Sequence, residues 1–430
     1  MKRSYNKSNE YFDRAEKIIP LASQTFSKSV TQYPKGVSPL FLEKGKGARV
    51  WDVDGNEYID FVNALLCVNL GYGYEEVDNA VIRKIREGGV SFSLPHLLEY
   101  EVAEKIVDLV PCAEKVRFGK NGSDATSAAI RLGRAFTKKD GVAVCGYHGW
   151  QDWYIGSTSK NEGVPSCVSK LTHKFEYNNI ESLEELFENT ENDIGVVILE
   201  PMNVFFPKDN FLEKVKEVTR KYGAILVFDE TITGFRFAKG GAQQLFDVTP
   251  DLATFGKGLA NGYPLSAVCG KAEIMDKMED IFFSGTFGGE TVSLAAAKAT
   301  LEVIDRENVT DKVTKLGELL MSELRKLIQL KSVGDIFDVG GHPVWSFLMI
   351  KDTEKYSSYD IKSILMKEIL ERGIISIGTH NLSYSHDQSH IKTLLDVYSE
   401  VFDLIRVGVN NSSLLDNFNG DVLKPLFKVR

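Results

Sequence analysis

The 430-residue sequence has few of the features that mark membrane, secreted, metal-binding or nucleic-acid-binding proteins. Its five cysteines are scattered, and no two of them have the spacing of a zinc site or a disulfide framework. No apolar run reaches the roughly 20 residues of a transmembrane helix, and the polar N-terminus has no signal-peptide core. A formal net charge of -9 argues against nonspecific nucleic-acid binding, which needs a basic surface. We therefore expect a cytoplasmic protein with no metal site and no membrane or nucleic-acid partner.

The composition that remains is ordinary for a globular protein, with 43% hydrophobic and 26% charged residues. From about residue 100, apolar segments such as "IGVVIL" and "AILVF" alternate with amphipathic segments that have helical periodicity. Strands that are apolar throughout are typical of a mostly parallel sheet covered on both faces. The sequence thus predicts an α/β fold with a large sheet domain over residues 56–305. A smaller α+β domain would comprise residues 306–430, with residues 1–55 contributing to it and to the active-site entrance.

Polar or aromatic residues follow the apolar segments at the points where the strands are expected to end. "IGVVIL" runs into Glu200, "AILVF" into Asp229 and "LATFG" into Lys257, whereas "KVRFG" leads to "KNGSDAT" and "GVAVCG" to "YHGW". In open α/β sheets, ligands bind at the carboxyl ends of the strands. Taken alone, each feature has an ordinary structural explanation, such as a helix cap or a turn. Their coincidence at one sheet edge indicates a ligand site.

Lys257 stands between two glycines in an apolar segment, which is unusual for a residue that normally lies in water. A lysine without competing charge can lose its proton near neutral pH and attack an aldehyde as a nucleophile. Pyridoxal 5′-phosphate supplies such an aldehyde. Asp229 could then face its ring nitrogen, Ser123 and the following helix N-terminus its phosphate, and Tyr147 its ring.

Six segments of the sequence resemble the class III aminotransferases, which are fold-type I enzymes that depend on pyridoxal phosphate. They are "KNGSDAT", "YHGW", "ILEP", "VFDETITGFR", "ATFGKGLANGYPLSAV" and "SGTFGGET". Within that family the sequence is most similar to glutamate-1-semialdehyde 2,1-aminomutase and its relatives, and "VWDVDGNEYIDF" and "HNLSYSH" support this narrower match. The resemblance extends over nearly the whole chain.

This resemblance implies a pyridoxal-phosphate fold-type I transferase in which Lys257 is the Schiff-base lysine and Asp229 is the partner of the ring nitrogen. It also implies a homodimer with shared active sites, because Thr286 matches a threonine that reaches the phosphate of the neighbouring subunit's cofactor. The other cofactor-binding residues that the resemblance implies are Gly122, Ser123, Tyr147, Glu200 and Thr231.

The sequence departs from the family pattern mainly where the substrate would bind. Lys28 stands where the aminomutase has an arginine for the substrate carboxylate, and lysine lacks the two-pronged donor geometry of arginine. Thr231 replaces a valine that packs beneath the cofactor ring, and "GTHNLSYSHDQSH" contains no arginine of the kind other members use for an α-carboxylate. We therefore expect a substrate site made of Lys28, Asn63, His380 and Asn381.

These observations favour an aminotransferase that moves an amino group from an amine donor to a small aldehyde or ketone acceptor. The alternative is an intramolecular 2,1-aminomutase of the glutamate-1-semialdehyde type. A cofactor-free scaffold is disfavoured because Lys257, Asp229 and the phosphate turn are all present. A nicotinamide dehydrogenase is disfavoured because no G-x-G-x-x-G motif follows a strand and opens a helix.

Overall fold

The computed structural model describes residues 3–190 and 193–425. The described residues divide into two compact units: unit 1 comprises residues 3–74 and 312–425, and unit 2 comprises residues 75–190 and 193–311. The sequence analysis predicted a large domain over residues 56–305. In the structure, residues 56–74 belong to unit 1 and residues 306–311 to unit 2. No helix in the described ranges is long and apolar enough to cross a lipid bilayer.

Unit 2 is built on a seven-stranded sheet with the order β4-β10-β9-β8-β7-β5-β6. Strands β9, β8, β7, β5 and β6 pair in parallel, and β10 pairs antiparallel with both of its neighbours. This arrangement confirms the predicted mostly parallel α/β sheet. The strands are β4 (Lys115–Gly119), β5 (Gly141–Cys145), β6 (Thr172–Lys174), β7 (Ile194–Leu199), β8 (Ile225–Asp229), β9 (Leu252–Phe255) and β10 (Ser266–Gly270).

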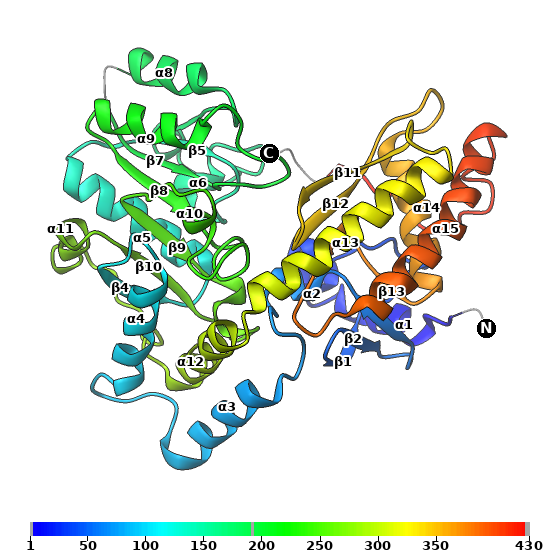
Figure 1. Cartoon of the computed structure of the whole chain (residues 1–430), viewed down its shortest axis with the longest axis horizontal. Coiled ribbons are helices and arrows are strands. Elements are labelled where there is room, and N and C mark those ends of the chain that lie inside the picture. Colours follow the sequence, from blue (N-terminus) through cyan, green and yellow to red (C-terminus); the bar gives the residue numbers. More distant parts are fainter. Residues whose placement is uncertain (1–2, 191–192, 426–430) are drawn as a thin grey trace. The chain divides into compact units, whose positions relative to one another are not determined.

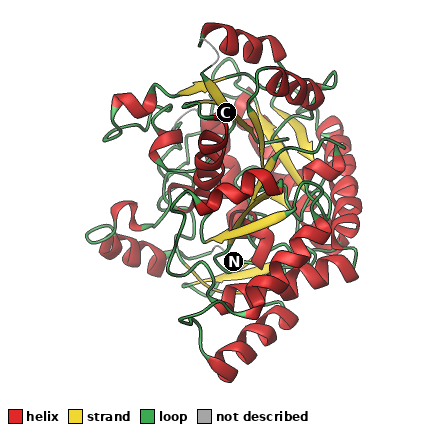
Figure 2. Cartoon of the chain, turned by 90° about the vertical axis from the view of Figure 1, so that its left-hand side faces the viewer, coloured by secondary structure: helices red, strands yellow, loops and turns green. Residues whose placement is uncertain are grey.

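Both faces of this sheet are buried, which explains why its central strands are apolar without interruption. Val142 and Val144 belong to a hydrophobic cluster with side chains of α5 (Gly122–Thr137). Ala143 and Cys145, which alternate with them along β5, belong to a second cluster with α8 (Ile180–Asn189) and α9 (Phe211–Lys221). Figure 1 and Figure 2 show the strands running between these helices. A period of two with both sets buried is the pattern of a covered parallel sheet.

The other helical segments of unit 2 surround this sheet. They are α3 (Glu75–Gly88), α4 (Leu97–Leu109), α6 (Asp152–Ile155), α7 (Ser166–Ser169), α10 (Ala242–Leu245), η3 (Lys257–Ala260), α11 (Ala272–Met275), η4 (Asp276–Glu279) and α12 (Thr291–Arg306). Helix α13 (Val309–Leu330) begins in unit 2 and continues into unit 1.

Unit 1 contains two small sheets, with the orders β1-β2-β3-β13 and β11-β12-β14. Strands β2 and β3 pair antiparallel, and Gly55 in the turn between them has a φ of 88°, as its Asp-Gly sequence predicts. The strands are β1 (Leu42–Lys46), β2 (Arg49–Asp52), β3 (Glu57–Asp60), β11 (Phe337–His342), β12 (Trp345–Ile350), β13 (Ile374–Ile375) and β14 (Thr379–Asn381). The helices are α1 (Asn6–Ala15), η1 (Pro20–Ala22), η2 (Phe26–Lys28), α2 (Asn63–Leu66), α14 (Ser358–Glu371) and α15 (Gln388–Asn410).

Candidate active site

The predicted cofactor residues of unit 2 follow the ends of its strands. Asp229 is the last residue of β8, and Glu200 comes directly after β7. Lys257 follows β9 and opens η3, while Tyr147 follows β5. Gly122 opens α5 after β4. The carboxyl ends of parallel strands lie at one edge of a sheet, which is where ligands bind in open α/β folds.

The carboxylate of Asp229 is buried and held from three directions. Its Oδ1 accepts hydrogen bonds from the Thr254 hydroxyl and from the Thr231 N–H, both at 3.1 Å. Its Oδ2 lies 2.8 Å from Nδ1 of His148, whose side chain is fully buried. Only 4% of Asp229 is exposed. The carboxylate is therefore fixed in position at the end of β8.

His148 faces a hydrogen-bond acceptor at each ring nitrogen. Nδ1 faces Asp229 Oδ2, and Nε2 lies 3.2 Å from the carbonyl oxygen of Cys145. The ring is therefore held between the Asp229 carboxylate and the backbone at the end of β5. The sequence analysis did not select His148, although it belongs to the "YHGW" segment.

This pairing determines the charge of Asp229. Burial acts to raise the pKa of the carboxyl, but the hydrogen bond and charge of His148, together with hydrogen bonding from Thr231, outweigh it and hold the pKa below its usual value. Asp229 therefore stays ionised at neutral pH in a site nearly closed to water. A fixed, ionised carboxylate suits a ligand group that carries a positive charge, such as a protonated ring nitrogen.

The N-terminus of α5 provides a place for an anion. The Asp124 carboxylate accepts hydrogen bonds from the N–H groups of Lys120 and Asn121, at 3.0 and 2.8 Å, and so orders the turn before the helix. The N–H groups of Gly122 and Ser123 lie in the first turn, where no helix carbonyl precedes them. Such N–H groups and the positive end of the helix dipole bind phosphate.

Glycines allow the chain to approach itself closely around this turn. A Cβ on Gly149, whose φ is 105°, would lie 2.4 Å from the Ser123 hydroxyl oxygen. A Cβ on Gly122 would lie 2.9 Å from the Thr231 methyl carbon, and a Cβ on Gly256 would lie 3.3 Å from that same carbon. The segments before Lys257, after Asp229 and at the start of α5 therefore meet around Thr231.

The Thr231 hydroxyl lies at this meeting point without a hydrogen-bond partner. Its Oγ1 is buried, and none of the residues that the structure describes forms a hydrogen bond of acceptable distance and angle with it. Leaving a buried hydroxyl unpaired costs about 1–3 kcal/mol. A small ligand that supplies the missing partner would remove this cost, so the residues fit a polar group bound here.

Lys257 has a strained backbone. Its φ is 38°, in the left-handed region that non-glycine residues rarely adopt. Its side chain is half-buried, whereas the following Gly258, Leu259 and Ala260 are buried. Strain of this kind persists only where the surrounding structure enforces it, and it concentrates at active sites.

Glu200 holds the loop that carries Tyr147. Its Oε2 accepts hydrogen bonds from the Tyr147 N–H at 2.9 Å and from the Asn203 Nδ2 at 3.0 Å. Gly146, with a φ of 106°, packs so closely that a Cβ there would lie 2.5 Å from this oxygen. The ring of Tyr147 is 37% exposed and contacts Tyr154 edge-on. Glu200 thus fixes the backbone that carries this partly exposed aromatic ring.

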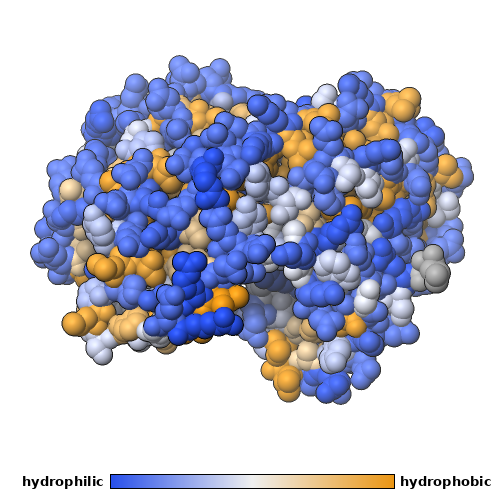
Figure 3. Space-filling view, turned by 60° about the horizontal axis from the view of Figure 1, so that its bottom comes forward, coloured by the Kyte–Doolittle hydropathy of each residue, from blue (hydrophilic) through white to orange (hydrophobic). Residues whose placement is uncertain are grey.

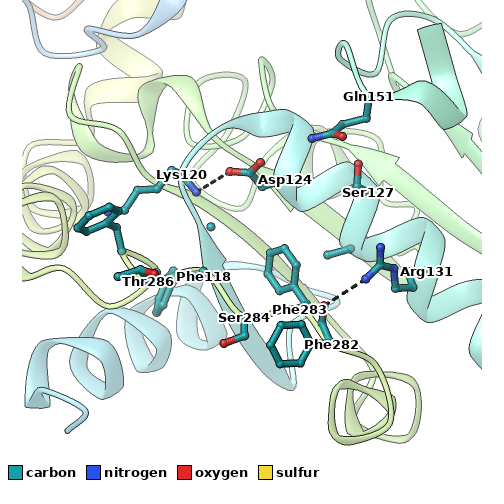
Figure 4. A pocket seen from close by; sticks show the side chains of 15 residues that line it. Phe118, Lys120, Asp124, Ser127, Arg131, Gln151, Phe282, Phe283, Ser284 and Thr286 are labelled. Carbon is teal, nitrogen blue, oxygen red and sulfur yellow. Dashed lines mark hydrogen bonds between the residues drawn. The ribbon is translucent and has the colours of Figure 1, made fainter. Parts of the chain in front are cut away.

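Thr286 lies in an exposed loop that faces α5 across a pocket of about 410 Å³. Figure 4 shows Thr286 and the neighbouring Phe282 and Ser284 opposite Asp124 and Arg131 of α5. The predicted role of Thr286 concerns a second subunit and remains a prediction.

The predicted substrate residues all lie in unit 1, whereas the predicted cofactor residues lie in unit 2. Lys28 is exposed at the end of η2. His380 is buried between the Ser346 hydroxyl at 3.0 Å and the Tyr398 hydroxyl at 2.9 Å, and burial lowers its pKa to about 3. Its ring is therefore uncharged at neutral pH.

Asn63 and Asn381 are buried together. The Asn63 amide donates to the Asn381 carbonyl at 2.5 Å, and the Asn381 amide donates to the Val62 carbonyl at 2.7 Å. Residues 63–66 have φ values of 51°, 49°, 60° and 70°, which is a left-handed turn without glycine. Asp60 stabilises its start by accepting the Val62 N–H at 2.7 Å. Substrate contact by these residues remains a prediction.

Comparisons with known proteins agree with this geometry. The sequence model of the family described as aminotransferase class-III matches residues 32–390. The chain is 34% identical to a 3-aminobutyryl-CoA aminotransferase of Cloacimonas acidaminovorans, with 92% of this chain and 96% of that protein covered. It is 35% identical to a glutamate-1-semialdehyde 2,1-aminomutase of Sulfurihydrogenibium sp., with 92% and 98% covered.

Solved structures show the same similarity. The FumI protein of Sphingopyxis sp. MTA144, in its PLP internal aldimine form, superposes with a TM-score of 0.87 at 27% identity, covering 94% of this chain and 98% of that one. An omega-transaminase from Sphaerobacter thermophilus superposes with a TM-score of 0.82 at 25% identity, covering 92% and 97%.

Proposed function

The chain belongs to the class III aminotransferases, and on this basis we propose that it moves an amino group from an amine donor to a small aldehyde or ketone acceptor. The observation that carries the proposal is the meeting of the Lys257 loop, the Asp229 turn and the start of α5 around Thr231. These three segments supply an amine, an ionised carboxylate and an anion site within one buried region. An enzyme that holds an aldehyde-bearing, phosphorylated ring needs these three groups together.

The cofactor of this family is pyridoxal 5′-phosphate, and the residues present fit it. When bound, it withdraws electrons from the carbon that carries the amino group, so that a proton can leave that carbon. In our proposal Asp229 holds a proton on the ring nitrogen, the Gly122 and Ser123 N–H groups bind the phosphate, and Tyr147 covers one face of the ring. The unpaired Thr231 hydroxyl supplies a further polar contact.

Lys257 has two tasks in this proposal. Its amine would hold the cofactor by the aldehyde until a donor amine displaces it. Nζ would then act as the general base that takes the proton from the substrate carbon bearing the amino group, and as the acid that returns it.

We propose that the acceptor has no α-carboxylate, because the chain lacks the arginines that would bind one. Residues 378–390 contain no arginine, and Lys28 stands in place of the aminomutase arginine. Lysine binds a carboxylate as a point charge rather than through a two-pronged donor pair. Lys28, Asn63, His380 and Asn381 remain the candidates for substrate recognition.

The second candidate function is an intramolecular aminomutase. It is favoured by the 35% identity to the glutamate-1-semialdehyde 2,1-aminomutase of Sulfurihydrogenibium sp.. The cofactor site proposed above would serve both reactions. The two functions differ in whether a separate acceptor is needed.

We also propose that the chain acts as a homodimer in which Thr286 of each subunit reaches the other subunit's cofactor phosphate. Figure 3 shows groups of hydrophobic residues on one face of the molecule, among mostly hydrophilic ones. Large apolar side chains of unit 2 are strongly exposed in the single chain, among them Leu94 (79%), Leu97 (74%) and Phe282 (85%). Exposed apolar surface of this kind marks protein contacts. Mixing Lys257→Ala and Thr286→Ala chains should restore one intact site per mixed dimer.

The test of function compares two assays of the purified holoenzyme. In the first, glutamate 1-semialdehyde is the only substrate; in the second, panels of amine donors and carbonyl acceptors are supplied together. The proposal predicts turnover only when a donor and an acceptor are both present. Turnover of glutamate 1-semialdehyde without an added acceptor would replace the intermolecular function with the aminomutase.

A further inference from the structure

A second cavity lies at the same edge of the unit 2 sheet, beside the cofactor residues. Its volume is about 760 Å³, within the range typical of small-molecule sites. The walls come from three neighbouring strands: Cys145 and Gly146 from the end of β5, Lys174 from the end of β6, and Glu200 after β7. None of the cofactor-binding roles proposed above requires this space.

The cavity lies outside two neighbouring strands, β5 and β7, whose connections to the next strand run to opposite sides of the sheet. Strands β5 and β7 are neighbours in the sheet. The chain leaves β5 toward β6 at one side, but it leaves β7 toward β8 at the other side. Connections that diverge in this way open a crevice outside the carboxyl ends of the two strands, and ligands of open α/β sheets bind in such crevices.

Most of the lining surface is apolar, and its charged side chains are Lys174, Glu176 and Glu200. Phe175, Val204 and Phe205 contribute hydrophobic surface. Burial raises the pKa of the Cys145 thiol to about 12, and the nearby Glu200 acts in the same direction. Burial likewise raises the pKa of Tyr177, whose hydroxyl donates to the Pro201 carbonyl at 2.7 Å. Both groups are therefore neutral at physiological pH, which suits an apolar ligand chain.

Two polar groups of the lining await a partner. The Asn203 Nδ2 donates to Glu200, which identifies the other end of that amide as oxygen. This Oδ1 is buried and, among the residues that the structure describes, has no hydrogen-bond donor. Lys174 is exposed, and its ammonium group forms no ion pair with any described residue. The lining also includes the carboxylates of Glu176 and Glu200, which already accept hydrogen bonds from protein groups. The cavity thus offers one unused acceptor and one cation.

The cavity adjoins the residues that would orient the cofactor ring. Gly146 and Glu200 line it, and the next residue, Tyr147, is held through its N–H by the same Glu200 oxygen. A substrate that extends past Tyr147 would therefore enter this space without moving the sheet.

We propose that this cavity binds the distal part of an elongated substrate: an apolar chain with an N–H or O–H donor for Asn203 and an anionic end for Lys174. The inference rests on the proposed aminotransferase function. It deepens that function by naming a class of donor, the long-chain amine with a terminal acid.

Binding is tested on the holoenzyme by isothermal titration with N-octanoylglycine, which has an apolar chain, an amide N–H and a carboxylate. We expect one site per chain. Lys174→Gln should weaken binding about tenfold, while Lys170→Gln, which removes a nearby exposed lysine outside the cavity, should leave it unchanged. Val204→Trp should fill the cavity and abolish binding, whereas Val204→Ala should change affinity less than threefold.

Absence of binding to the wild type, or equal effects of Lys174→Gln and Lys170→Gln, would overturn the proposal. The lysine pair decides the question even if Val204→Trp fails to fold.

The role in substrate binding is tested with two donors, 8-aminooctanoate and 4-aminobutanoate. We expect kcat/KM to favour the longer donor by at least tenfold, and Val204→Trp to remove that preference while sparing the shorter donor. Equal use of both donors by the wild type would refute this inference but leave the aminotransferase function intact. Failure of every donor would refute the proposed function, while the titration would still report on the cavity.

Discussion

Replacing His148 should weaken cofactor binding by changing the state of Asp229. In the native site the His148 ring, together with hydrogen bonding from Thr231, outweighs the effect of burial and lowers the pKa of the Asp229 carboxyl. In His148→Ala only the Thr254 hydroxyl and the Thr231 N–H would remain as donors, both at 3.1 Å. The carboxylate would then be buried without a charged partner, and its pKa would move upward.

The size of the effect follows from the bond that is lost. A hydrogen bond to a charged group contributes about 1.5–3 kcal/mol. A loss of about 2 kcal/mol corresponds to about 30-fold weaker binding of the cofactor, if the ring nitrogen loses that much stabilisation. His148→Asn keeps a neutral donor toward Asp229 and should fall between the wild type and His148→Ala. The dissociation constant is measured by titrating the apoenzyme with pyridoxal phosphate and recording absorbance.

The pH dependence gives a second measurement. Because Asp229 must be ionised to hold a proton on the cofactor, the cofactor should be released at a higher pH in His148→Ala than in the wild type on acidification. His173→Gln, which changes another histidine of the same sheet at its β6 edge, serves as the control. Unchanged affinity and an unchanged pH profile in His148→Ala would show that the pairing does not govern the site.

Three further predictions concern other parts of the chain. Thr231→Val removes the unpaired buried hydroxyl, so it should stabilise the apoenzyme by about 1–2 kcal/mol in urea unfolding while weakening cofactor binding; equal effects on both forms would contradict the proposed contact. Gly149→Ala places a Cβ against Ser123 and should weaken cofactor binding at least tenfold, whereas Gly163→Ala, with a similar positive φ but open space around it, should change only stability. Three histidines of unit 1 have pKa values lowered by burial to about 4, about 3 and about 3: His342, His380 and His386. They protonate in the unfolded chain below about pH 6.5 but stay neutral in the native one, so the free energy of unfolding should fall as pH decreases toward 4, by about 1.4 kcal/mol per pH unit for each histidine; a flat profile would contradict this.

Much of unit 2 could be predicted from local patterns, because its central strands are buried on both faces and read as unbroken apolar runs. The runs that end at Asp229 and before Lys257 are β8 and β9 in the structure. Parallel pairing then requires both ends to lie at one edge of the sheet. Local sequence thus sufficed to predict that these two residues share an edge.

Interactions between distant segments could not be predicted in this way. His148 contacts Asp229 across 81 positions of sequence, and nothing in "YHGW" distinguishes a paired histidine from a packed one. The unpaired Thr231 hydroxyl depends on the close approach of Gly122 and Gly256, which only the folded chain produces.

Unit 1 was less predictable for a different reason. The segment Asn63–Leu66 contains residues that favour right-handed helices, yet the structure gives all four a positive φ. Asp60 stabilises this turn through backbone hydrogen bonds, and Tyr72 donates to that carboxylate at 2.6 Å. Tertiary contacts here override local propensity, which the sequence pattern cannot reveal.

The central claim is that Lys257 binds the cofactor at the edge of the unit 2 sheet. It is tested most directly by reducing the holoenzyme with borohydride, digesting it and locating the attached cofactor by mass spectrometry. The account predicts one modified residue per chain, Lys257, and no modification in Lys257→Ala. Attachment to another lysine, or a wild-type enzyme that retains no cofactor after reduction, would contradict it.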